Sequence, residues 1–459
     1  MVKLERKTRV WPGMWSALAA VCCLVLAAPL ACAPGDPEVV PPSYAPSTAY
    51  ETYAHSLNQA NLADTALGRD WTAAGEEALT DPVDISLPFQ ETGYFDEAEA
   101  MAFAFRFDAQ GGQSLDIVLE IDSGRPARIF MDLFRVVEEQ GIDDVHVATG
   151  AGEMRRIQLE LRRDASYVLR LQPELLRSAR YTLTVRKDAS LEFPVAGRDT
   201  GAIQSGFGAP RDAGRRSHRG VDIFAPRGTP VLAAAEAWVT RVRETAVGGR
   251  VIWLRNKHNG DALYYAHLEH QDVEEGQEVS PGDQIGRVGN TGNARTTPPH
   301  LHFGVYVRGS GARDPFPYLR QIHDSPPSSD FDTDHLGAWS RSTESDVALR
   351  AAPGRRARVV RSLETHTPIQ VLAGTGTYFR VRLPDGTAGY VSARLTELAE
   401  VPLRNEELMV AHQVHDRPLM GAPVMEDLSA GEELPVLGSF GQFLYVRTPK
   451  GYMGWLVFN

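Results

Sequence analysis

Four histidines and one aspartate in three short segments carry the strongest chemical signal of this sequence. The segments read His218-Arg-Gly-Val-Asp222, Tyr265-Ala-His267-Leu268 and His300-Leu-His302-Phe303. Each lies among β-forming residues, and a strand sends alternate side chains to the same face. We therefore expect His218 and Asp222 to point the same way, and His300 and His302 likewise. Two such strands side by side bring two imidazoles and a carboxylate together, which is the donor set of a catalytic zinc site with one position left to water.

Each motif taken alone has an ordinary structural explanation. A histidine four residues before an aspartate is common on protein surfaces. Two histidines on one buried strand face need polar partners of some kind, and His267 alone is typical of a core or surface histidine. The three motifs in this order, within one segment of globular composition, favour a shared site.

Residues from about 193 to 319 resemble the lysostaphin-type (LytM-like) zinc metallopeptidases, which cut the peptide stems or cross-bridges of peptidoglycan. Beside the histidines, the resemblance rests on ordered motifs: Ser205-Gly-Phe-Gly208, Gly228-Thr-Pro-Val-Leu-Ala233, Val279-Ser-Pro-Gly282, Gly286-Arg-Val-Gly-Asn-Thr-Gly292 and Asp314-Pro315. It implies that His218, Asp222 and His302 bind Zn²⁺. It also implies that His267 and His300 are catalytic without binding the metal, and that residues 193–322 form a small β domain.

Two positions depart from the family pattern. The segment from Asn293 to Pro299 replaces the usual small Ser/Thr-Gly turn before the final H-x-H, and Gly304 stands where a glutamate often follows the phenylalanine. Neither change removes a ligand or a catalytic histidine. They bear on substrate preference.

Composition excludes several classes of protein. A length of 459 residues allows about three domains. A formal net charge of −12 argues against nucleic acid as a partner. Cys22, Cys23 and Cys32 all lie near the start, so the chain after Cys32 contains no internal disulfide, no thiolate zinc site and no cysteine nucleophile.

Residues 1–32 are expected to be a signal peptide. A basic start is followed by an apolar stretch from Trp15 to Ala31, which is short for a permanent membrane helix, the alternative interpretation. Leu30-Ala31-Cys32 resembles a lipobox, in which Cys32 becomes the lipidated first residue; ordinary signal cleavage is the alternative. We expect an exported protein, periplasmic or at the cell surface, with a lipid anchor in the membrane.

The next two segments lead up to the zinc motifs. Residues 33–81 read as a Pro-rich tether and a helix, with Tyr50, Tyr53 and Leu57 at helical spacing, for packing onto the next domain or for binding a partner. Residues 82–190 alternate strongly, which predicts a β-sandwich. This region loosely resembles the bacterial pre-peptidase C-terminal domain.

The C-terminal third contains an internal repeat after a linker at residues 323–345. Val381-Arg-x-Pro-x-Gly386-x-x-Gly389-Tyr390 recurs as Val446-Arg-x-Pro-x-Gly451-x-x-Gly454-Trp455. Residues 346–399 and 405–459 each resemble a bacterial SH3-type barrel, a module that binds cell wall, acts as a spacer or docks a partner. The predicted fold class is mainly β and multidomain: a sandwich, a small β peptidase domain and two SH3-like barrels.

These features predict a zinc-dependent endopeptidase acting on stems or cross-links of peptidoglycan. One alternative is a non-catalytic activator of a separate cell-wall amidase, but such relatives have usually lost zinc ligands, and every ligand position here is filled. A wall-binding anchoring protein, the other alternative, rests on the barrels alone. The sequence does not determine the bond cut, the oligomeric state or the biological process.

Overall fold

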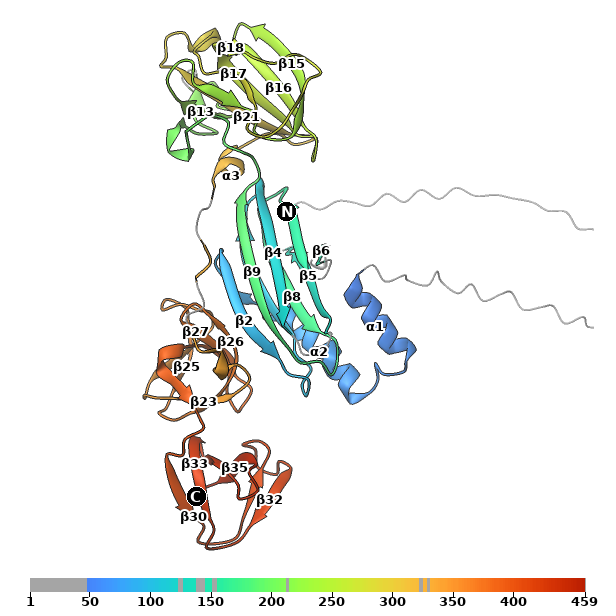
Figure 1. The fold of residues 1–459 in the computed structure, drawn as a ribbon, viewed down its shortest axis with the longest axis vertical. Helices are drawn as coiled ribbons and strands as arrows, with labels where there is room; N and C mark the ends of the chain where they lie inside the picture. Colours follow the sequence, from blue (N-terminus) through green and yellow to red (C-terminus); the bar gives the residue numbers. More distant parts are fainter. Residues whose placement is uncertain are drawn as a thin grey trace, which may run out of the picture. The chain divides into compact units, whose positions relative to one another are not determined.

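The computed structural model describes residues 48–122, 127–137, 145–150, 155–211, 214–321, 325–327 and 331–458. The predicted signal peptide, Cys32, nearly all of the Pro-rich tether and part of the predicted linker lie outside these residues. Among the described residues, no helix combines the length and the apolar character needed to cross a membrane. The described chain is mainly β, as the sequence predicts (Figure 1).

From residue 48 onwards, where the described chain begins, two helices precede the first strand, α1 (Ala49–Gln59) and α2 (Ala66–Thr80). Thr48 begins α1 with a capping box: its hydroxyl accepts from the Glu51 N–H, and the Glu51 carboxylate accepts from the Thr48 N–H. Trp71 of α2 is buried, stacks on Tyr50 at 4.8 Å and donates from Nε1 to the carbonyl of Pro173 in the following domain. The helical segment therefore packs onto the next domain.

The alternating region forms two sheets that enclose one hydrophobic core. One sheet has the order β1 (Val83–Asp84), β3 (Phe103–Ala109), β8 (Ala165–Pro173), β5 (Ile129–Arg135) and β6 (Val145–Thr149). The other contains, in order, β2 (Phe89–Phe95), β9 (Ala179–Ala189), β4 (Gln113–Asp122) and β7 (Arg156–Glu160). In β4, Leu115, Ile117 and Leu119 are fully buried and alternate with half-buried side chains. The two sheets around one shared core confirm the predicted sandwich.

The repeated C-terminal motif gives two similar groups of strands. The first has β23 (Trp339–Ser342), β24 (Val347–Arg350), β25 (Val359–Leu363), β26 (Pro368–Thr375), β27 (Tyr378–Arg382), β28 (Ala388–Ser392) and β29 (Thr396–Leu398). The second has β30 (Arg404–Glu407), β31 (His412–His415), β32 (Val424–Leu428), β33 (Glu433–Phe440), β34 (Phe443–Arg447) and β35 (Met453–Val457). The cross-strand register Val371–Val381–Gly389 of the first recurs as Val436–Val446–Gly454 in the second. The sequence repeat is thus a structural repeat. The predicted linker at residues 323–345 is wrong at its end, because β23 lies within it and pairs with β26 and β29 of the first repeat.

The first repeat continues a sheet of the sandwich, which the sequence did not predict. Strand β26 pairs antiparallel with β2, with Thr92 opposite Gly374. Beside this pairing the Glu91 carboxylate is fully buried and accepts hydrogen bonds from Arg380 at 2.9 Å and from the Tyr181 hydroxyl at 2.8 Å. A buried carboxylate is tolerated only when it is paired, so Arg380 ties the repeat to the sandwich.

Arg380→Ala should destabilise the protein by about 3–5 kcal/mol, because it leaves the Glu91 charge buried without a cation. Arg382→Ala is the control, since Arg382 pairs with Glu99 near the surface, where a pair contributes about 1 kcal/mol or less. Denaturant unfolding followed by tryptophan fluorescence measures both variants. Equal losses in the two would show that the buried pair is not a structural tie.

The main sheet of the predicted peptidase region has the order β10 (Ile203–Ser205), β13 (Val221–Phe224), β21 (His300–Val307), β17 (Ala262–Leu268), β16 (Gly249–Asn256), β15 (Ala237–Thr245) and β19 (Glu278–Val279), with β22 (Gly311–Arg313) paired to β21. A smaller sheet has β14 (Pro230–Leu232), β20 (Gln284–Arg287) and β18 (His270–Gln271); a hairpin of β11 (Pro210–Arg211) and β12 (Arg216–Ser217) and the short helix α3 (Phe316–Leu319) complete the region.

One face of strands β13 and β21 packs into the hydrophobic core of this region. Its fully buried side chains are Val221 and Ile223 on β13 and Leu301 and Phe303 on β21. Because side chains alternate along a strand, Asp222, His300 and His302 are left on the opposite face. Core packing thereby orients the polar residues of the site.

Candidate metal centre

Asp222 and His302 lie directly opposite each other on the antiparallel strands β13 and β21. The His302 Nδ1 atom is 3.0 Å from the Asp222 Oδ1 atom. Side chains opposite each other in this way have Cβ atoms about 4.5–5.5 Å apart, close enough to reach one cation. Strand pairing therefore brings two of the three predicted ligands together.

His218 reaches the same point from outside the strand. β13 begins at Val221, so His218 belongs to the segment between β12 and β13, and the prediction that one strand carries both His218 and Asp222 is wrong. A backbone carbonyl orients the ring instead: Nδ1 lies 2.8 Å from the Gly206 oxygen, and Nε2 lies 3.1 Å from Asp222 Oδ1. An Nδ1–H that donates to a carbonyl leaves the Nε2 lone pair available to a metal.

The donor atoms of His218, Asp222 and His302 lie within 4.8 Å of one another, and in the described part of the chain no other group of three such residues does so. Gly220 allows this approach, since a Cβ there would lie 2.8 Å from the Cε1 atom of His302. Two imidazoles and one carboxylate are the donors of a three-ligand catalytic zinc site. The residues present therefore fit zinc.

His300 and His267 lie beside this cluster, and in both rings, as in His218, the Nδ1 atom lies against a backbone carbonyl. The Nδ1 atom of His300 is 2.9 Å from the Pro298 carbonyl, and that of His267 is 2.9 Å from the Thr291 carbonyl. The two rings are 5.1 Å apart, and His300 Nε2 is 3.9 Å from the nearer Asp222 oxygen. Each ring thus presents an Nε2 lone pair, which is what a proton acceptor requires.

His267 owes its position to an unusual backbone conformation. Its φ of 62° lies in the left-handed region, which residues other than glycine seldom adopt. Its N–H donates to the carbonyl of Gly248 at 2.8 Å, outside the regular ladder. Such conformations persist where the surroundings impose them, often at functional sites.

The surroundings set protonation states that suit metal binding. Burial, together with the neighbouring His300 and His302, lowers the pKa of His267 to about 4. Burial also lowers the pKa of His302, against the opposing effect of Asp222. Burial raises the pKa of the Asp222 carboxyl, but hydrogen bonds and charges from His218 and His302 outweigh it and hold that pKa well below its usual range. At neutral pH Asp222 is ionised, and the rings of His267 and His302 are neutral.

The cluster opens into a cavity of about 760 Å³. Tyr264 and Tyr306 form part of its wall, and the Tyr264 ring stands edge-on to His302 at 5.8 Å. Arg211 of β11 donates to Asp222 Oδ2 at 2.5 Å and to the Ser205 hydroxyl at 2.7 Å. The space beside the donors is large enough for a peptide segment.

Sequence reasoning missed Arg211, Tyr264 and Tyr306. Tyr306 could have been predicted to line the site, because it follows His302 by four residues in one strand and so shares its face. Arg211 had none: it reaches Asp222 through a hairpin whose geometry no local pattern encodes.

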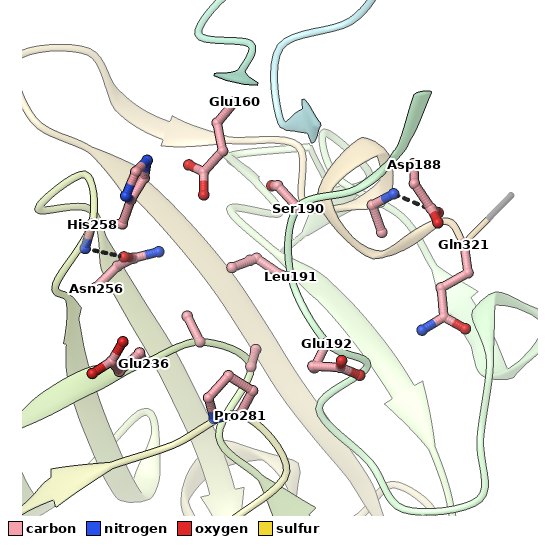
Figure 2. A pocket seen from close by; sticks show the side chains of 13 residues that line it. Glu160, Asp188, Ser190, Leu191, Glu192, Glu236, Asn256, His258, Pro281 and Gln321 are labelled. Carbon is pink, nitrogen blue, oxygen red and sulfur yellow. Dashed lines mark hydrogen bonds between the residues drawn. The ribbon is translucent and has the colours of Figure 1, made fainter. Parts of the chain in front are cut away.

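A second cavity, of about 320 Å³, shares no lining residue with the metal centre (Figure 2). Carboxylates of Glu160, Glu192 and Glu236 line it, and Asn256 accepts from the backbone N–H of His258 at its edge. Its lining residues provide no group of three ligand atoms close enough to hold a metal.

Two stretches of the chain match known families. Residues 216–315, which include all five predicted site residues of this region, match Peptidase family M23. The chain carries an M23 peptidase domain. Residues 345–397 match the Bacterial SH3 domain, which agrees with the first predicted repeat.

The chain is similar, over part of its length, to parts of several curated proteins. It is 37% identical over 139 residues to the L-Ala–D-Glu endopeptidase of Bacillus subtilis, a match that covers 28% of this chain and 42% of that protein. The peptidoglycan DD-endopeptidase ShyC of Vibrio cholerae is 37% identical over 94 residues, or 20% of this chain and 21% of ShyC. The uncharacterized lipoprotein YgeR of Escherichia coli is 38% identical over 104 residues, 22% of this chain and 39% of YgeR. The chain thus spans less than half the length of each.

Among solved structures, the catalytic domain of the antimicrobial peptidase lysostaphin from Staphylococcus simulans is 35% identical. The match covers 25% of this chain and 88% of that one, with a TM-score of 0.23.

Proposed function

We propose that this protein is a zinc-dependent endopeptidase that hydrolyses peptide bonds in the stems or cross-links of peptidoglycan. The observation that carries the proposal is the convergence of His218, Asp222 and His302, with two further histidines oriented by backbone carbonyls, on one open cavity. The relative named as a peptidoglycan DD-endopeptidase supports the substrate class, and the relative named as an L-Ala–D-Glu endopeptidase supports cleavage of peptide bonds. The complete ligand set favours an enzyme over a non-catalytic activator.

The residues of the site have different roles in the reaction. His218, Asp222 and His302 would hold zinc, which would supply Lewis-acid chemistry by making a water more acidic and by polarising the scissile carbonyl. The Nε2 atom of His267 or His300 accepts the proton of the attacking water, and the same proton can then pass to the leaving amine. The second histidine steadies the charge that develops on the carbonyl oxygen. Arg211 holds the second oxygen of Asp222, which keeps the carboxylate in place.

Digestion of purified peptidoglycan, with the released fragments identified by mass, tests this function. The wild-type protein should release peptide fragments with new amino termini, and addition of a chelator should stop the release. Intact peptides in the digest, or release of sugar fragments alone, would contradict an endopeptidase.

We also propose that the protein is exported and anchored by lipid at Cys32. The lipobox-like Leu30-Ala31-Cys32 supports this, as does the naming of one relative as a lipoprotein. Cys32→Ala should move the protein from the detergent phase to the soluble fraction, whereas the control Cys23→Ala should stay in the detergent phase. Finding the wild type already soluble would show ordinary signal cleavage.

A further inference from the structure

Positive charge is concentrated around the metal centre. Four arginines line its cavity, Arg211, Arg215, Arg216 and Arg219, and Asp222 is the only carboxylate among the described lining residues. The whole chain carries a formal charge of −12, so this concentration does not follow from composition. A cavity whose lining carries an excess of one sign of charge attracts a ligand of the opposite sign.

The four arginines are not equivalent. Arg211 donates hydrogen bonds to Asp222 and Ser205, so its charge is used to hold the Asp222 carboxylate in place. Arg219 follows the ligand His218 directly, is exposed, and has no hydrogen-bond or ion-pair partner for its side chain among the described residues. It lies near Tyr306: burial raises the pKa of that hydroxyl, and the Arg219 charge acts in the opposite direction. Arg219 therefore lines the cavity, with its charge close to Tyr306.

We propose that Arg219, supported by the charges of Arg215 and Arg216, binds a substrate carboxylate close to the scissile bond. A guanidinium binds a carboxylate with two parallel hydrogen bonds, which gives geometric selectivity as well as attraction. Stem peptides carry free carboxylates on their acidic residues and at their ends, whereas the interior of a glycine bridge offers only neutral amides. The M23 domain accordingly selects acidic stem peptides over neutral bridges. This selection rests on the proposed function.

The test uses two synthetic stem peptides that differ only in one group, a carboxylate or a carboxamide on the residue beside the scissile bond, and a pentaglycine peptide. The wild-type protein should cleave the carboxylate peptide with a kcat/KM about 10-fold above that of the carboxamide, mainly through KM, because a hydrogen-bonded charge contributes on the order of one tenfold step. Arg219→Gln should lower kcat/KM for the carboxylate peptide about 10-fold more than for the carboxamide. The preference should shrink with added salt.

Binding of the same peptides to chelator-treated, metal-free protein separates this inference from the proposed function. Wild-type protein should bind the carboxylate peptide about 10-fold more tightly than the carboxamide, and Arg219→Gln should bind both alike. The control is Arg241→Gln, an exposed arginine of β15 that does not line the cavity, and it should keep the preference. Cleavage of wall without any preference overturns the subsite alone. A binding preference without cleavage overturns the endopeptidase and leaves the carboxylate site standing.

Discussion

Replacing His302 with alanine should remove bound zinc and cleavage together. His302 is one of the three donors that the described residues bring together in the cluster, and its Nδ1 atom lies 3.0 Å from the Asp222 oxygen and 3.0 Å from the donor atom of His218. With two donors left, the site cannot hold zinc in the tetrahedral arrangement that uses three protein ligands and one open position. Metal analysis of the purified protein should show a loss from about one zinc per chain to a trace, with peptide release at background.

The matched control is His270→Ala, which removes an exposed histidine of β18 that does not line the metal cavity. This variant should keep both zinc and activity. Far-ultraviolet circular dichroism of both variants checks that the sheets are intact, since Leu301 and Phe303 on the core face of β21 are unchanged. If His302→Ala retained one zinc per chain, the assignment of the three ligands would have to be revised.

The sequence predicted those parts of the site that depend on strand periodicity. Asp222, His300 and His302 alternate with apolar residues that must enter the core, so their common face follows from a period of two. His218 and His267 follow a different logic. The first is oriented by the Gly206 carbonyl from outside a strand, and the second by a left-handed backbone at the end of β17. Their identities were readable from the motifs, but their conformations depend on neighbours distant in the sequence.

Contacts between domains could not be predicted either, because they also depend on residues that are distant in the sequence. The alternating pattern of β2 and the repeat that contains β26 each indicated a strand, but nothing local stated that the two would pair. Glu91 and Arg380 are 289 residues apart in the sequence, and each alone reads as an ordinary surface charge. Only the fold shows that they neutralise one another in a buried position, and why neither is easily replaced.

His300 and His302, the two histidines of the H-x-H motif, should respond differently to substitution, although they share one face of β21. The non-ligand His267 should behave like His300. His300→Ala and His267→Ala should each keep near-normal zinc and still bind wall fragments, because neither residue belongs to the cluster of three donors. Each removes a ring whose Nδ1 is held by a backbone carbonyl and whose Nε2 serves proton transfer or the developing charge. Losing a general acid–base group lowers turnover by about 10²–10⁴-fold, which zinc-loaded variants and purified wall can measure.

The pH profile identifies which of the two is the general base. The His267 ring, with a pKa lowered to about 4 by burial and by its histidine neighbours, is neutral and able to accept a proton at neutral pH. If it is the base, wild-type activity should fall only as the pH drops towards that value and the ring becomes charged. This acid limb should flatten in His267→Ala and persist in His300→Ala, or the reverse if His300 is the base. Loss of zinc from His300→Ala as complete as from His302→Ala would instead make His300 a ligand, and the division of roles between the two histidines of the strand would be wrong.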